Sequence, residues 1–274
     1  MMRKSYQEIN GELLDAQKAW EKILVDGDSS IKQLKDPDSK GRCFNTLSFP
    51  FYFGISDKYG ESHKKKIMII GQETGGGFDF RNSNNEKIKA DNKPEASQKW
   101  TYTYNEDQRV NGSNQSPFWS FIRHINAFPD CISCYNNVDK IHFSKISEGD
   151  TTNSNSIIPI PLSYKAEKLF SASFDFNGEI KPLLLREICI LKRYNLLDAI
   201  VFTTGPYYDQ TMEWALGLNR KTLRAWRPTD DTPLRDVSEE IQLAGIKVFW
   251  TYHPNYLRLK RKESMVLDTL FKQI

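Results

Sequence analysis

The chain has 274 residues, of which 39% are hydrophobic and 27% are charged. Its mean hydropathy of −0.59 is typical of a soluble protein, and no apolar run approaches the roughly 20 residues that cross a bilayer. The N-terminal residues also lack the apolar core of a signal peptide. We therefore expect a cytoplasmic protein without a membrane partner.

The net charge is only +3, so the positions of the basic residues matter more than their sum. One basic cluster covers residues 64–66 and a second covers residues 258–262. Both flank loops that we consider functional below, which favours a polyanionic partner. A merely solvated surface is the alternative interpretation.

The four cysteines do not form a complete metal motif. Cys131 and Cys134 make a CxxC pair, but no second pair or nearby histidine follows it, and Cys43 and Cys189 are far away in sequence. We predict reduced structural thiols, no metal and no cofactor.

The first 62 residues are predicted to form an N-terminal extension. Apolar residues recur at helical spacing in residues 1–34, with an interruption at residues 26–29. Residues 35–62 are rich in aromatics, prolines and glycines. They indicate an ordered loop packed on a core, with a base-stacking surface as the alternative.

A buried strand and a glycine-rich loop begin the main domain, residues 63–274. Residues 67–70 are four large apolar residues, typical of a strand buried on both faces, and residues 71–77 read GQETGGG. Residues 81–115 are polar and indicate a surface excursion. Ser116 and Pro117 are the start signals of a short helix.

Three further apolar runs alternate with helical patterns. A second strand is predicted in residues 131–143, ending around Asn136 and Asn137, and is followed by a second polar excursion. The remaining predicted elements are a helix at 178–194, a strand at 197–205, a helix at 207–216, a basic loop at 219–236, a helix at 238–244, a strand at 246–250 and a helix at 265–271. This alternation predicts a three-layer α/β/α fold around a central four-stranded parallel sheet.

Two of the predicted strands end in residues suited to hydrolysis. Glu73 follows the first strand and His253 follows the last. Because parallel strands release their loops at one edge of the sheet, both side chains are expected to face one cavity. A carboxylate activates water there, and an imidazole stabilises negative charge on a leaving group.

The chain resembles the uracil-DNA glycosylase superfamily in four short motifs. IMIIGQETGG resembles the superfamily's first motif, and HPNYL resembles its second, an HPS sequence followed by an apolar residue. YNNVDKI is similar to the strand that carries the base-reading asparagine, and LDAIVFTTG to the third strand. The likeness covers residues 64–262 and implies a DNA glycosylase-like hydrolase that needs no cofactor.

The resemblance implies roles for individual residues. Glu73 positions the attacking water, and His253 supports the charge on the departing base. Asn137, or Asn136 in a register shifted by one residue, reads the base. The remaining residues that it places at the site are Gly71, Gln72, Thr74, Phe78 and, at the minor groove, Pro254, Asn255 and Tyr256.

The likeness has limits and leaves other functions open. Thr74 stands where the family usually has proline, so the identity of the base stays open. We expect Arg258, Lys260 and Arg261 to contact the DNA backbone, and no obligate protein partner. One alternative is a non-catalytic nucleic-acid-binding module of the same fold. Another is a nucleotide or nucleoside hydrolase, although GQETGGG is neither a Walker nor a GxGxxG sequence.

Overall fold

The computed structural model describes most of the chain. The described residues are 4–27, 47–50, 53–71, 94–112, 114–137, 146–148, 183–209, 212–213, 216, 218, 223–243 and 245–274. Among the described helices, none is long and apolar enough to span a membrane.

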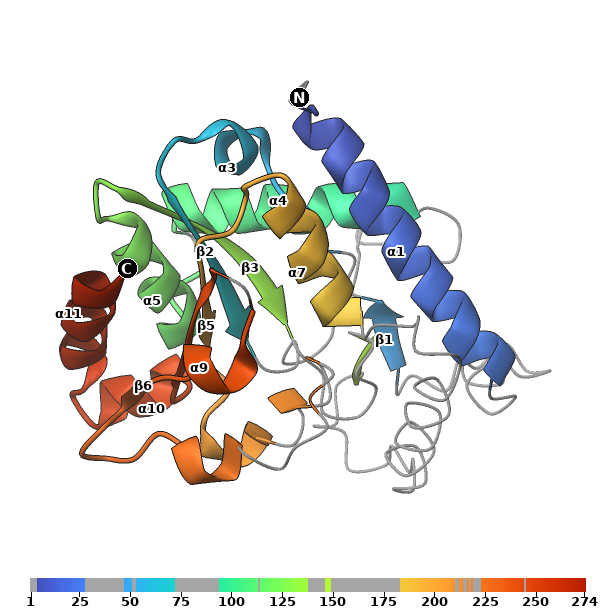
Figure 1. Cartoon of the computed structure of the whole chain (residues 1–274). Coiled ribbons are helices and arrows are strands. Elements are labelled where there is room, and N and C mark those ends of the chain that lie inside the picture. The colour runs from blue at the N-terminus through green and yellow to red at the C-terminus, as the bar shows by residue number, and fades with distance from the viewer. Residues whose placement is uncertain are drawn as a thin grey trace, which may run out of the picture.

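The protein is an α/β protein built on a five-stranded sheet (Figure 1). Its strands are β2 (Lys65–Gly71), β3 (Cys131–Asn137), β5 (Ala199–Phe202), β6 (Leu234–Asp236) and β7 (Lys247–Thr251), in the order β3-β2-β5-β7-β6. All neighbours are parallel except β6 and β7. Buried apolar residues fill the central strands, as the apolar runs in the sequence predict.

The fifth strand corrects the expectation of a four-stranded, wholly parallel sheet. β6 lies in the segment predicted as a basic loop and pairs antiparallel with β7, with Leu234 opposite Thr251. It has three residues, of which only Leu234 is buried. So short a strand has no room for an alternating pattern, and its pairing depends on the neighbouring strand.

Helices cover both faces of the sheet. On one face lie α1 (Tyr6–Gly27), α3 (Asp57–Glu61) and α7 (Leu183–Arg193); α7 lies in front of the sheet in Figure 1, and α1 packs against α7. On the other face lie α5 (Pro117–Asn126), α10 (Pro254–Leu259) and α11 (Glu263–Gln273), which contact one another. The remaining elements are α9 (Ser238–Ile241), the 3₁₀ turns η2 (Pro206–Tyr208) and η3 (Leu223–Trp226), and a small antiparallel pair of β1 (Leu47–Pro50) and β4 (Ile146–Glu148).

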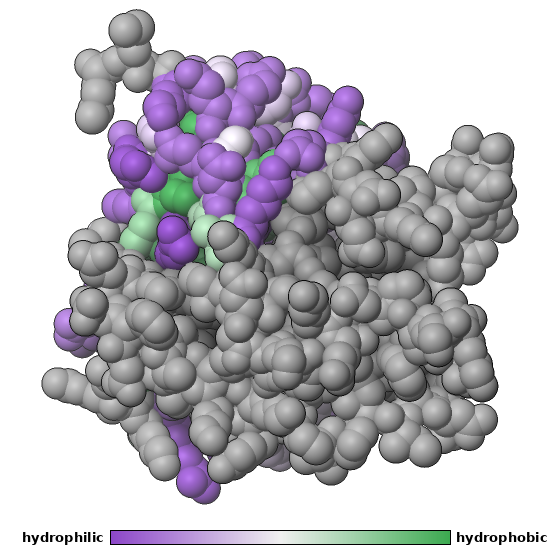
Figure 2. Space-filling model, turned by 90° about the vertical axis from the view of Figure 1, so that its right-hand side faces the viewer, coloured by the Kyte–Doolittle hydropathy of each residue, from purple (hydrophilic) through white to green (hydrophobic). Residues whose placement is uncertain are grey.

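The N-terminal extension shares the core of the main domain. Ile9 and Leu13 of α1 lie in one hydrophobic cluster with Phe53, Ile55 and the apolar residues of the sheet. The outer face of α1 is polar, and Figure 2 shows a largely hydrophilic surface over the described residues on that side. The amphipathic pattern at the start of the sequence is therefore used to cover the sheet, and Phe53 packs in the core as predicted.

A long helix, α4 (Pro94–Val110), corrects the predicted surface excursion at residues 81–115. Its buried face carries Gln98, Thr101 and Gln108, which are 5%, 2% and 2% exposed. The Gln98 amide donates to the carbonyls of Asn10 and Phe53, both at 2.9 Å. The helix buries polar groups, so it lacks the apolar periodicity by which sequence patterns identify buried helices.

The exposed edge of β3 is closed by two asparagine side chains. Asn126 Oδ1 accepts from the Ser133 amide at 2.8 Å, and Asn105 Nδ2 donates to the Tyr135 carbonyl at 3.4 Å. These contacts come from α5 and α4 and satisfy backbone groups that an edge strand otherwise leaves open to pairing. The end of β3 is thereby held in place beside β2.

Candidate active site

Four parallel strands end at one edge of the sheet, and the candidate site lies there. β2 ends at Gly71, which is in register with Asn137 at the end of β3. Phe202 at the end of β5 is in register with both Ile70 and Trp250. Since β5 separates β2 from β7, the starts of the loops after β2 and β7 are two strand spacings, about 10 Å, apart.

His253 lies two residues beyond β7 and caps α10. Its Nδ1 accepts a hydrogen bond from the Asn255 amide at 3.2 Å, and Pro254 occupies the first helical turn, where its missing N–H costs no hydrogen bond. An Nδ1 that accepts carries no proton, so the neutral ring carries its proton on Nε2. No described residue accepts a hydrogen bond from that Nε2.

The surroundings of His253 favour the neutral ring. The side chain is partly buried, and this burial lowers the pKa of His253. The ring of Phe118, in the first turn of α5, stacks on the imidazole with centroids 6.1 Å apart and planes 20° apart. The site therefore presents an uncharged imidazole with one N–H donor at neutral pH.

Gly71 keeps its place beside two aromatic rings because it has no side chain. A Cβ at this position would lie 3.0 Å from Tyr135 and 3.1 Å from Phe118. Phe118 thus lies close to the end of β2 and stacks on His253 beyond the end of β7.

The loop after β5 fixes the middle of this edge. The Thr203 hydroxyl donates to the Ile70 carbonyl at 3.0 Å, and the Gly205 amide donates to Thr251 at 3.0 Å. Gly205 has φ of +74°, and a Cβ there would lie 3.9 Å from the His253 amide.

Sequence reasoning identifies Gly205 only as the end of an apolar run. It misses Phe118 and Tyr135 as site residues because their importance depends on contacts between distant elements.

Asn136 and Asn137 differ in where the strand places them. The Asn136 side chain is fully buried and its amide donates to Glu187 Oε2 of α7 at 3.1 Å. Glu187 Oε1 in turn accepts from Gln17 of α1 at 2.7 Å. Asn136 therefore belongs to a buried network on the α1 and α7 face, whereas Phe118 and His253 lie on the α5 face. Asn137 ends β3 opposite Gly71.

The predicted minor-groove residues begin a helix, which corrects the expectation of a loop. Pro254, Asn255 and Tyr256 form the first turn of α10. The Tyr256 hydroxyl donates to Asp230 at 2.9 Å, and its ring stacks on Tyr252 with centroids 4.4 Å apart. Gln72, Glu73, Thr74 and Phe78 lie outside the described residues.

The two basic clusters lie at opposite edges of the sheet. Arg258, Lys260 and Arg261 are exposed at the end of α10, on the side of the candidate site. Residues 64–66 precede or begin β2 and therefore lie at the amino edge, and Lys66 is buried with its ammonium bonded to the Ser62 carbonyl. Only the C-terminal cluster flanks the site.

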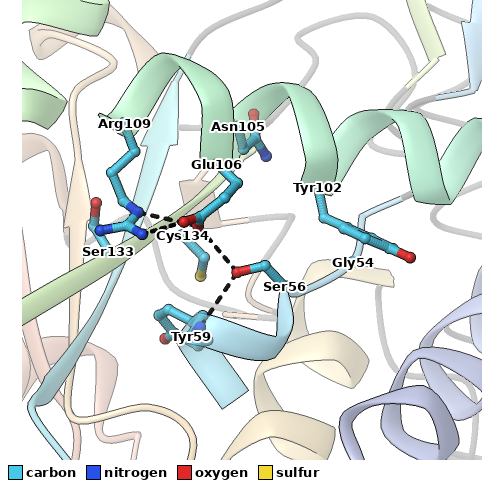
Figure 3. Close-up of a pocket in the computed structure, with 9 residues that line it drawn as sticks. All are labelled: Gly54, Ser56, Tyr59, Tyr102, Asn105, Glu106, Arg109, Ser133 and Cys134. Atoms are coloured by element: carbon cyan, nitrogen blue, oxygen red, sulfur yellow. Dashed lines mark hydrogen bonds and ion pairs between the residues drawn. The ribbon is translucent and has the colours of Figure 1, made fainter. Parts of the chain in front are cut away.

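A small cavity lies away from this edge, between α3, α4 and β3 (Figure 3). Its volume of about 20 Å³ holds one water molecule and is too small for a nucleobase. Figure 3 shows Arg109 and Ser56 directed at Glu106, with the Ser56 hydroxyl 3.1 Å from the carboxylate. Burial raises the pKa of Glu106, but Arg109, Lys58 and Ser56 outweigh it and lower the pKa. The ion pair of Arg109 with Glu106 lies within α4, and Lys58 of α3 pairs with the same carboxylate at 3.1 Å, which joins the two helices.

Cys131 and Cys134 are buried in β3. Side chains alternate along a strand, so residues three positions apart point to opposite faces. The two thiols therefore do not form a pair that binds one metal ion. Among the described residues, no group of three or more His, Cys, Asp or Glu side chains is arranged as a metal site.

Comparisons of the chain with protein-family models, with curated proteins and with solved structures each found no match.

Proposed function

We propose that the protein is a DNA glycosylase-like hydrolase with a uracil-DNA glycosylase-like fold. It cleaves the N-glycosidic bond of a damaged or deaminated base that is flipped out of the DNA. The observation that carries the proposal is His253 at the carboxyl edge of the parallel strands, where its Nδ1 accepts from the Asn255 amide and burial lowers its pKa, so that the neutral ring with its proton on Nε2 is favoured. The parallel strand order β3-β2-β5-β7, with helices on both faces, supports this choice of fold.

His253 acts on the leaving base. When the glycosidic bond breaks, negative charge develops on the base and its carbonyl oxygens. A neutral imidazole donates a hydrogen bond from Nε2 to such an oxygen, and the Asn255 amide at Nδ1 holds the ring in the required tautomer. The apolar ring of Phe118 at its side limits the access of water, which strengthens this hydrogen bond.

Glu73 supplies the water-activating carboxylate. Two residues of chain span at most about 7 Å, so Glu73 begins within that distance of Gly71. Gly71 is itself held against Phe118, which stacks on His253. In this proposal the Glu73 carboxylate orients a water molecule for attack on the sugar carbon.

Asn137 is the base-reading residue in this proposal. It ends β3 in register with Gly71, whereas the Asn136 amide is committed to the buried Glu187. An amide side chain offers both a donor and an acceptor to the edge of a base. Gln72, Thr74 and Phe78 complete the pocket, with Thr74 contributing to the choice of base.

The test is the release of free base from oligonucleotides that contain uracil, hypoxanthine or xanthine, detected by mass spectrometry. We expect release from at least one of them. Glu73→Gln and His253→Asn should each slow it by about 100-fold or more, because each removes a group that acts in the transition state. His124→Asn is the matched control, since His124 is exposed on α5 and pairs with Glu263 outside the site.

Failure to release any of the three bases would contradict the proposal. If the same samples bind DNA in a salt-dependent way without release, the non-catalytic module becomes the better description. Tight mononucleotide binding without affinity for DNA would instead favour a nucleotide or nucleoside hydrolase.

A further inference from the structure

Three tyrosines, one exposed and two partly exposed, form a strip beside the candidate site, on segments that follow β5 and β7. Tyr207 lies in η2, two residues after Gly205, and is 78% exposed. Tyr252 precedes His253 directly, and Tyr256 follows it in α10. Tyr252 and Tyr256 stack on each other. Burial, the charge of Asp230 and the Tyr207 phenol raise the pKa of Tyr252, so the three phenols lie close enough to interact.

A cation accompanies each end of this tyrosine strip. The Arg227 guanidinium lies 6.0 Å from the ring centre of Tyr207 and is fixed by Asp209 at 2.6 Å. The Lys260 ammonium lies 5.6 Å from the ring centre of Tyr256. Among the described residues, no carboxylate lies within ion-pair distance of Arg258, Lys260 or Arg261. The strip therefore combines ring faces with two cations, of which Arg227 is paired with Asp209 and Lys260 has no described carboxylate within ion-pair distance.

Contacts within the protein hold the strip rigid. The Tyr256 hydroxyl bonds to Asp230, and Lys262 bonds to the Asp230 carbonyl, which ties α10 to the segment after η3. The bond between Arg227 and Asp209 ties the same segment to η2. Aromatic rings that are already fixed lose little conformational entropy when a ligand stacks on them.

We propose that the tyrosine strip, with Arg227 and Lys260, binds a single-stranded segment of DNA next to the base at His253. Unpaired bases expose faces that stack on aromatic side chains, whereas a duplex keeps those faces inside its own stack. The phosphates of the same DNA strand pair with the cations at the two ends of the strip. The positive charge of Lys260, which no described carboxylate pairs with, favours a polyanion as the ligand. The choice of DNA rests on the proposed function.

Binding without turnover tests this proposal separately from catalysis. A fluorescently labelled, undamaged oligonucleotide of about 15 nucleotides is titrated with the full chain, as a single strand and as a duplex, and anisotropy is measured. We expect the single strand to bind at least about tenfold more tightly. Tyr207→Ala should weaken single-strand binding by about 5- to 100-fold, the loss typical of one stacked base. Tyr207→Phe, which keeps the ring, should bind within about twofold of the unmodified protein.

Two controls separate the strip from other effects. Phe128→Ala removes an exposed ring from the turn before β3, at the opposite edge of the sheet, and should leave binding unchanged. His253→Asn should abolish base release while single-strand binding persists. Equal affinity for duplex and single strand, or unchanged binding by Tyr207→Ala, would overturn the strip proposal. Strand binding that depends on Tyr207, in a protein that releases no base, would overturn the proposed function alone.

Discussion

At the scale of single residues, His253 has two duties that support each other. As the cap of α10, its Nδ1 must remain unprotonated to accept the Asn255 amide. In the proposed role as a donor to a leaving base, it must carry its proton on Nε2. Both duties require the neutral ring, and its burial beside Phe118 favours that form.

The lowered pKa of His253 predicts a pH dependence of stability. The pKa of a histidine in an unfolded chain is about 6.5. The pKa of His253 in the folded protein lies below that value. Between the two pKa values the unfolded chain binds more protons, so stability rises with pH in this window. The contribution of neutral His253 to the free energy of unfolding is complete above about pH 6.5. It is lost as the pH falls toward the pKa of His253 in the folded protein.

Urea unfolding between pH 5 and 7.5 measures this effect. His253→Asn keeps a side chain that caps helices and should make the free energy of unfolding less dependent on pH. His124→Asn, an exposed histidine on α5, should leave the contribution of His253 in place. A pH slope unaltered by His253→Asn would show that His253 does not titrate differently in the folded protein.

Gly71 predicts a packing effect that a second glycine controls. Gly71→Ala places a methyl group 3.0 to 3.2 Å from the rings of Tyr135 and Phe118 and should destabilise the protein by about 1–3 kcal/mol. Gly11 lies exposed in α1 with nothing within 4 Å of a Cβ. Gly11→Ala should stabilise by about 0.5–1 kcal/mol through helix propensity. Urea titrations of both variants measure the sign of the change in the free energy of unfolding. If both substitutions stabilise the protein, the rings of Tyr135 and Phe118 move aside for the methyl group without loss of stability.

At the scale of elements, α1 is joined to the segment before α3 by a paired hydrogen bond. Asn10 Nδ2 donates to the Ile55 carbonyl at 2.8 Å, and Asn10 Oδ1 accepts from the Ile55 amide at 2.9 Å. Gln98 of α4 donates to the Asn10 carbonyl from the other side. These amides connect three elements where a hydrophobic contact alone would leave backbone groups without partners.

Asn10→Ala should therefore be strongly destabilising. It leaves the buried N–H and C=O of Ile55 without their partners, at a cost of about 2 to 6 kcal/mol for the two groups. The control is Asn111→Ala, which removes an exposed bond to Asp107 and should stay within about 0.5 kcal/mol. Denaturant titrations of both variants test the difference. If the two variants lose the same free energy of unfolding, water replaces the Asn10 side chain as the hydrogen-bond partner of Ile55 without loss of stability.

At the scale of the whole molecule, only one of the two basic clusters lies beside the candidate site. The cluster after α10 flanks the candidate site, and residues 64–66 lie at the amino edge. A DNA strand at the site releases counterions only where it meets the first cluster. The small net charge of the protein does not reveal this difference between the clusters.

The salt dependence of DNA binding measures which cluster is used. Lys260→Gln and Arg261→Gln should each reduce the slope of log K against log salt concentration by about one. Lys65→Gln, an exposed lysine at the amino edge, should not change it. A slope that falls with Lys65→Gln and not with Lys260→Gln would place the DNA at the other edge.

The sequence by itself determined the sheet's parallel strands, the amphipathic α1 and the start of α5. Those features depend on local patterns, namely apolar runs that end at glycine, helical spacing, and Ser116 with Pro117. Tertiary structure alone decided that α4 is a helix with a buried polar face, that β6 extends the sheet, and that Asn136 bonds to Glu187. These features depend on polar partners and pairings far away in the chain. An asparagine or glutamine looks the same in the sequence whether its side chain is buried or exposed. Only its contacts in the folded protein distinguish the two cases.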